Sequence, residues 1–130
     1  MIVYLDTSAS YKLLHRESKS EELIQWLSSL DDLQLVASEL MRVELLGNLG
    51  ARHPQLVPAA NELVKRVTLI SLSPQYLNGA IELVAQGLGT LDAIHLATAM
   101  SAGSELHALV TYDKQLAQAA AAKGVKVVTP

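Results

Sequence analysis

The stretch Ile2-Val3-Tyr4-Leu5-Asp6-Thr7-Ser8 sets the frame for the rest of the chain. Its first four residues form a short apolar run of the kind that a buried β-strand requires. A carboxylate, Asp6, follows this run directly, and a helical pattern continues from about Thr7 to Arg16. A buried strand that passes through a carboxylate into a helix indicates the start of an α/β fold.

The same alternation continues to the end of the chain. Apolar runs predict five strands, at residues 2–5, 33–37, 67–72, 108–111 and 125–128. Helical patterns fill the intervals, at residues 7–16, 18–30, 38–48, 54–64, 74–87, 90–102 and 113–123. Strands separated by helices need crossover connections, and continuous apolar strands are buried on both faces. We therefore expect a single α/β domain over residues 1–130, with a parallel five-stranded sheet flanked by helices on both faces.

Capping signals refine where these helices begin. Ser18 and Glu21 have the spacing of a capping box, which predicts the start of the second helix. Ser38 is placed to cap the third helix, and Ser73-Pro74 gives a cap followed by a proline in the first helical turn. Pro54 suits the first turn of the helix expected at 54–64.

Composition excludes several classes of protein. The 130 residues contain 10 Lys+Arg and 13 Asp+Glu, so the net charge of −3 argues against a polybasic nucleic-acid binder. No cysteine is present, which excludes a disulfide scaffold, a cysteine-based zinc site and a thiol nucleophile. The chain has no apolar run of membrane-spanning length and no signal-peptide pattern at its start, so we expect a cytoplasmic protein without a membrane partner.

Four carboxylates stand at positions where a solvated surface role is not the obvious explanation. Asp6 and Asp113 follow the first and fourth predicted strands, where open parallel sheets bind ligands, although both could simply cap helices. Glu44 shares an apolar helical stripe with Leu40 and Met41, and Arg42, two positions away, points elsewhere on the helix. The fourth acid, Asp92, lies in the first turn of the helix at 90–102.

Asp92 shares a helix face with His95, Leu96 and Ala99, a face expected to meet the sheet. Like charges gathered at one edge of the sheet would repel one another unless a cation lay among them. An all-oxygen ligand set suits Mg²⁺ or Mn²⁺ rather than zinc. Because Mg²⁺ commonly meets substrate phosphates, the pattern favours cleavage of a phosphate ester by metal-activated water.

Four segments, in order and spacing, resemble the PIN domain and, within it, the VapC-type ribonuclease toxins of bacterial toxin–antitoxin pairs. The segments are Val3-Tyr4-Leu5-Asp6-Thr7-Ser8, Arg42-Val43-Glu44-Leu45, Leu91-Asp92-Ala93-Ile94-His95-Leu96-Ala97 and Val110-Thr111-Tyr112-Asp113. The resemblance covers the whole chain. It implies strand order 3-2-1-4-5 and a metal-dependent endoribonuclease. It also implies an antitoxin protein partner and a homodimer.

The resemblance further implies that the four acids, Asp6, Glu44, Asp92 and Asp113, are the catalytic, metal-binding residues. It favours a supporting role for Thr7 or Ser8, which could bond Asp6 or a metal-bound water but are equally good residues for starting a helix. Thr111 is a third supporting candidate, because it could orient Asp113. Relatives often carry another polar residue shortly after the fourth acid, and the stretch at 114–117 here is Lys-Gln-Leu-Ala.

Other residues have both a functional and a structural interpretation. His95 could be a metal ligand or base, but a hydrogen bond within the helix–sheet packing is the favoured interpretation. Lys12 and Arg16 could hold RNA phosphates, yet a basic pair at helical spacing is usually a solvated face. Tyr11 and Trp26 could stack on bases but suit core or interface positions. The remaining histidines, which show no partner spacing and are expected at the surface or in loops, are His15, His53 and His107.

Other functions compete with the nuclease hypothesis. A receiver domain would need an acidic pair after the first strand, and an aspartate-nucleophile phosphatase would need an acid at Ser8. Neither pattern is present. A non-catalytic PIN-like module that binds RNA or protein, and a housekeeping RNA-processing nuclease, remain as alternatives.

Overall fold

The computed structural model describes all residues from Met1 to Pro130, and its architecture is the predicted one. Five strands form one parallel sheet in the order β3-β2-β1-β4-β5. The strands are β1 (Ile2–Leu5), β2 (Gln34–Ser38), β3 (Thr68–Ile70), β4 (Leu106–Val110) and β5 (Val127–Val128). The strand order reverses between β1 and β4, so the central pair forms the switch point where open α/β sheets bind ligands.

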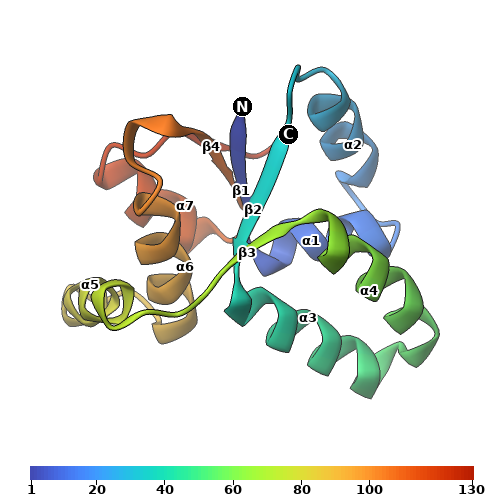
Figure 1. Cartoon of the computed structure of the whole chain (residues 1–130), viewed down its shortest axis with the longest axis horizontal. Coiled ribbons are helices and arrows are strands. Elements are labelled where there is room, and N and C mark those ends of the chain that lie inside the picture. Colours follow the sequence, from blue (N-terminus) through green and yellow to red (C-terminus); the bar gives the residue numbers. More distant parts are fainter.

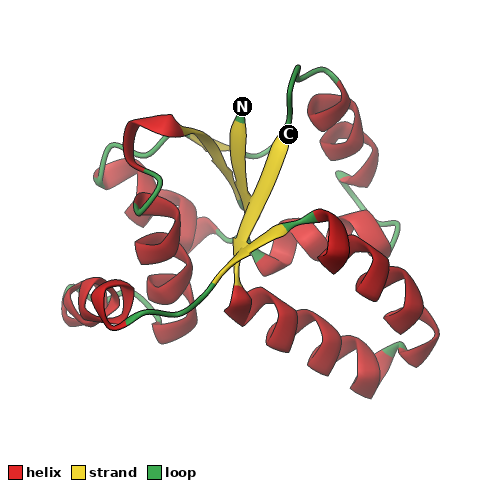
Figure 2. Cartoon of the chain, in the orientation of Figure 1, coloured by secondary structure: helices red, strands yellow, loops and turns green.

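Helices cover both faces of the sheet (Figures 1 and 2). Their bounds are α1 (Thr7–Leu14), α2 (Ser20–Ser28), α3 (Glu39–Arg52), α4 (Val57–Arg66), α5 (Pro74–Ala85), α6 (Thr90–Met100) and α7 (Lys114–Ala122). In Figure 1, α5, α6 and α7 lie on one side of the sheet and α1 to α4 on the other. None of these helices has the length and apolar character needed to cross a membrane.

The alternation of side chains along β1 divides the core into two sides. Tyr4 packs with residues of α5, α6 and α7, whereas Val3 and Leu5 pack against α1 and α2. A further cluster joins Ala37 of β2 to the buried faces of α3 and α4. Val3, Tyr4 and Leu5 are all fully buried, as expected for an apolar strand in a sheet covered on both faces.

Several boundaries differ from the predicted ones. The capping box at Ser18 is wrong, because α2 has Lys19 at its N-cap position in a left-handed conformation with no side-chain cap. The hydroxyl of Ser20 accepts from the Glu17 amide (3.0 Å) and donates to the Lys12 carbonyl (2.7 Å). This bond ties α1 to the start of α2, a tertiary contact that the local sequence pattern does not show.

The other differences are shifts of a few residues at element ends. Pro54 opens a short 3₁₀ turn, Pro54–Leu56, and α4 begins only at Val57. The third strand is shorter than predicted, and α3 extends to Arg52 instead of ending near Asn48. The caps at Ser38 and Ser73 are confirmed, since each hydroxyl accepts a backbone N–H in the first turn of its helix.

Candidate active site at the carboxyl edge of the sheet

The four predicted acids come from four separate segments near the carboxyl ends of β1 and its neighbours. Asp6 directly follows β1, and Asp113 follows the adjacent strand β4. Glu44 lies on α3, which leaves the carboxyl end of β2, and Asp92 lies in the first turn of α6. Parallel pairing brings the ends of β1, β2 and β4 to one edge, so the topology places these segments at the switch point.

Asp6 is the most enclosed of the four, with 3% of its surface exposed. Its Oδ1 accepts from the Ser8 hydroxyl (2.7 Å) and the Ala9 amide (2.9 Å), and its Oδ2 accepts from the Thr111 hydroxyl (2.5 Å). Burial raises the pKa of this carboxyl above its ordinary value, and these three donors oppose that rise. Asp6 thus caps α1, as the simpler interpretation held, and also carries a second set of contacts that a cap does not need.

Thr111 connects the two central strand ends. Its hydroxyl donates to Asp6 and accepts from the amide of Asp113 (3.0 Å), so one side chain fixes both acids. Asp113 in turn caps α7, because its Oδ1 accepts from the Leu116 amide (3.0 Å). Ser8 makes a second link between the segments that follow β1 and β4, because its hydroxyl donates to Asp6 and accepts from the Tyr112 amide (3.0 Å). Ser8 and Thr111, two of the predicted supporting residues, therefore both bond directly to Asp6, and Thr111 also bonds to the amide of Asp113.

Glu44 is held by two donors on the same oxygen. The Thr7 hydroxyl and the His95 Nε2 each lie 2.7 Å from Oε1, whereas Arg42 pairs with Glu39 at 3.8 Å. Burial by itself would raise the pKa of Glu44, but the hydrogen bonds from His95 and Thr7 hold it below its usual value. The carboxylate is therefore kept in its charged form, with Oε2 not engaged by either donor.

Tyr4 is the residue of this site that the sequence interpretation missed. Its buried hydroxyl accepts from the Ser38 amide (3.1 Å) and lies 2.7 Å from His95 Nδ1. One proton arrangement satisfies every group: Tyr4 donates to Nδ1, and the Nε2–H of a neutral His95 donates to Glu44. A buried strand tyrosine must find a hydrogen-bond partner, which is the signal the sequence offered. The structural interpretation of His95 is correct, and its packing contact also orients Glu44.

Asp92 is the acid whose pKa is raised by neighbouring carboxylates as well as by burial. Burial, together with the negative charges of Asp113 and Asp6, raises its pKa from 3.8 to about 6. Asp6 and Asp113 therefore both lie close enough to Asp92 to disfavour its charged form. Glu44 belongs to a neighbouring cluster, joined to the first by the consecutive residues Thr7 and Asp6.

The donor set fits a hard divalent cation. All four acids offer oxygen, and the raised pKa of Asp92 records repulsion that a cation among the carboxylates would relieve. No three His, Asp or Glu side chains are already arranged to ligate one ion. Mg²⁺ needs only one or two protein carboxylates, because it retains much of its water.

The predicted basic and aromatic candidates are mostly engaged elsewhere. Lys12 pairs with Glu17 at 3.1 Å, and Arg16 lies 3.6 Å from Glu21, so both members of the predicted basic pair have acidic partners. Trp26 stacks on His107, which lies near the start of β4 and away from the acids. The other histidines are expected at the surface or in loops. His15 and His53 agree with this, because they directly follow α1 and α3, and their ring centroids lie 5.2 Å apart. The expectation is wrong for His107, which is half-buried within β4.

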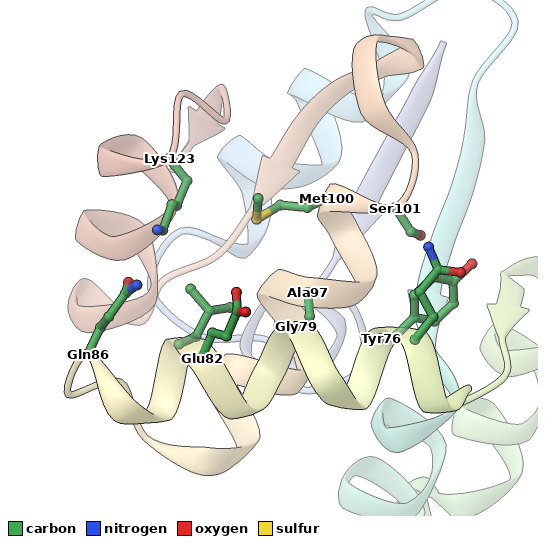
Figure 3. A pocket seen from close by; sticks show the side chains of 10 residues that line it. Tyr76, Gly79, Glu82, Gln86, Ala97, Met100, Ser101 and Lys123 are labelled. Carbon is green, nitrogen blue, oxygen red and sulfur yellow. The ribbon is translucent and has the colours of Figure 1, made fainter.

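A separate hollow of about 350 Å³ lies between α5 and α6 (Figure 3). Tyr76, Met100 and Lys123 are among the residues that line it. Met100 is at the end of α6 opposite to Asp92, so this hollow is not part of the acidic site.

Comparison with known proteins gives one consistent family. The PIN domain profile matches residues 3–122. Ribonuclease VapC35 of Mycobacterium tuberculosis is 39% identical, over 99% of this chain and 97% of the relative. Ribonuclease VapC46 of the same organism is 35% identical, over 98% and 97% of the two chains.

Solved structures share the fold at lower identity. The crystal structure of Mycobacterium tuberculosis VapC20, a sarcin–ricin loop cleaving toxin, matches with a TM-score of 0.79 and 17% identity, over 98% of this chain and 99% of that chain. A toxin–antitoxin complex from Klebsiella pneumoniae matches with a TM-score of 0.72 and 21% identity, over 98% and 97%. These likenesses confirm the predicted strand arrangement.

Thr111→Val tests the link between the two strand ends. The substitution keeps the shape but removes the hydroxyl that donates to a buried carboxylate, so we expect the free energy of unfolding to fall by about 1–3 kcal/mol at pH 7. The loss should shrink at acidic pH, because protonation of Asp6 removes the charge that needs the donor. Urea unfolding at both pH values measures this, and the exposed Thr68→Val is the control. Equal effects of the two variants would contradict the assignment.

Asp92→Asn tests the like-charge repulsion. Because the folded-state pKa is raised from 3.8 to about 6, folding favours the protonated form, and stability from this group is lost as the pH rises through that range. In EDTA at pH 7, we expect Asp92→Asn to raise the melting temperature by about 2–4 °C, with little change at about pH 4. Circular dichroism melts measure both values. The control Asp31→Asn, at an exposed position, should not show this pH-dependent rise in melting temperature. If Asp92→Asn raised the melting temperature equally at both pH values, the result would argue against repulsion.

Proposed function

The chain belongs to the PIN-domain family, and from this premise we propose that it is a metal-dependent endoribonuclease that hydrolyses RNA phosphodiester bonds. The observation that carries the proposal is the buried Asp6 carboxylate, held by three donors and placed within the electrostatic reach of Asp92 and Asp113. Near-full-length similarity to proteins named ribonucleases supports the same activity. We assign the site to the acids Asp6, Glu44, Asp92 and Asp113, with Mg²⁺ or Mn²⁺ as the cofactor.

The protein's own side chains prepare this site for a cation. Ser8 and Thr111 fix the orientation of Asp6 and favour its charged form. Thr7 and His95 do the same for Glu44, and the negative charge of Asp113 adds to the attraction for a cation. When bound, such an ion supplies the Lewis acidity that activates water and offsets charge developing on the phosphate. Without a cation, the acids would repel a phosphate placed directly among them, so binding of the phosphate that is cut should be coupled to metal binding.

An antitoxin partner is part of this proposal. The fold neighbours include toxin–antitoxin complexes, and the relatives named VapC ribonucleases match the chain over nearly its full length. We propose that the protein is the toxin of such a pair and that the antitoxin blocks the acidic site. An RNA substrate also implies a cytoplasmic location.

An exposed apolar face on α5 and α6 supports a homodimer. Leu77, Ile81 and Val84 line one side of α5, and Leu91 lies half exposed beside Asp92. Ile81 is the most exposed of these, at 64%, and it borders an apolar hollow of about 320 Å³. Isolated exposed apolar residues are ordinary, but a contiguous group is typical of an interface. A dimer through this face would bring two acidic sites close to one interface.

The activity is tested by the cleavage of a labelled single-stranded RNA of mixed sequence. We expect cutting in Mn²⁺ or Mg²⁺, none in EDTA, and a loss of about 100-fold or more in Asp6→Asn, which removes one anionic ligand with little change of shape. Asp31→Asn, purified identically, should cut at the wild-type rate.

Two outcomes would contradict the proposal. Equal cutting by the wild type and Asp6→Asn would identify a contaminating nuclease. No cutting, together with no Mn²⁺ binding by calorimetry, would favour the non-catalytic module instead.

The dimer is tested by Ile81→Glu, which places a charge at the centre of the apolar face. We expect the wild type to elute with twice the chain mass in size-exclusion chromatography with light scattering, and the variant to elute as a monomer. Ile24→Glu, at another exposed apolar position, should leave the mass unchanged. A wild-type monomer at all concentrations would contradict this interface.

A further inference from the structure

A hollow of about 440 Å³ opens beside the acidic site, between α1 and the C-terminal end of α3. Thr7 and Ser8 form part of its wall, and these residues donate to Glu44 and Asp6. The hollow, which we call the α1–α3 hollow, therefore shares two wall residues with the contacts of the acids. A ligand seated in it would lie directly next to a group bound at the acidic site.

Aromatic rings form part of this wall and are already held in place. Tyr11 stacks on His15, with ring centroids 5.3 Å apart and planes 23° apart, and His15 lies 5.2 Å from His53. Tyr11 and His53 both line the hollow, and Tyr112 lines it with Lys12 over its ring at 4.6 Å. Fixed rings lose little conformational freedom when a flat ligand stacks on them.

One cation at the hollow has no partner in the protein. Lys12 is neutralised by Glu17, whereas Arg52, in the last turn of α3, forms no ion pair. The guanidinium is exposed and lines the hollow, with the Asn48 amide on the preceding turn. A free guanidinium beside aromatic rings matches the two parts of a nucleotide, a phosphate and a base.

We propose that the α1–α3 hollow binds a nucleotide of single-stranded RNA adjacent to the bond that is cut. The base stacks among Tyr11 and His53, and the phosphate binds Arg52. The identity of the polymer rests on the proposed function. A protein segment is the weaker fit, because apart from the two tyrosines the hollow is lined by polar and charged side chains. The exposed apolar face suited to a protein lies on α5 and α6 instead.

The binding test uses the 5′-phosphorylated dinucleotide pApU and ¹⁵N-labelled protein without metal. We expect saturable amide shifts at Tyr11, Asn48, Arg52 and His53. Arg52→Gln should weaken binding about three- to tenfold and reduce its salt dependence, as loss of one phosphate contact does. Arg66→Gln is the matched control, because Arg66 is also exposed and unpaired but precedes β3 at the opposite edge of the sheet. The spectrum of each variant reports its fold.

The second measurement is the cleavage of labelled RNA in Mn²⁺, where Arg52→Gln should raise KM by a similar factor and leave kcat within about twofold.

No shifts in the hollow, or equal weakening by Arg66→Gln, would overturn the nucleotide site. Shifts that appear only with an added protein partner would replace it with a protein-docking surface. If the wild type binds pApU in the hollow but cuts no RNA, the proposed function fails while the nucleotide site stands. If Arg52→Gln cuts RNA with an unchanged KM and pApU causes no amide shifts in the hollow, only the nucleotide-site proposal fails.

Discussion

A buried negative charge at the end of the central strand is the constraint on which the rest of the structure depends. Asp6 has almost no contact with solvent, and a carboxylate in that position is costly unless donors surround it. Its donors come from the start of α1 and from Thr111 beyond β4. The loops after β1 and β4 must therefore meet, and this requirement fixes the geometry of the edge where the acids gather.

The same strand also organises the second half of the site. Tyr4 points to the face opposite Leu5 and reaches His95 on α6, and His95 reaches Glu44 on α3. A chain of hydrogen bonds therefore crosses from the Ser38 amide, at the end of β2, through the core to the acidic edge. The helix layers on the two faces of the sheet are connected by polar contacts only where the site is formed. Elsewhere they are separated by apolar packing, so the site and the junction of the layers coincide.

The sequence predicts the parts of this arrangement that depend on local patterns. Apolar runs located all five strands, and an acid after a strand located Asp6 and Asp113. Glu44 could be singled out because it shares an apolar helical stripe with Leu40 and Met41, where a carboxylate needs a partner. What the sequence could not show are pairings between distant segments. The bond of Tyr4 to His95 joins residues 91 positions apart, and that of Thr111 to Asp6 joins residues 105 apart. The predicted capping box at Ser18 is wrong for the same reason. The hydroxyl of Ser20 donates to a carbonyl of α1, a contact between two helices that the local pattern does not show.

The spread of the four acids along the chain has a consequence for protein synthesis. The residues that complete the site, Thr111 and Asp113, are made long after Asp6 and Glu44, and β4 must pair with β1 before Thr111 can reach Asp6. A nascent chain that ends before residue 106 contains three of the four acids, Asp6, Glu44 and Asp92, but lacks β4 and the residues Thr111 and Asp113 that follow it. The edge where the four acids meet is therefore incomplete throughout most of the protein's own synthesis. Any activity that needs all four acids begins only after β4 has paired with β1.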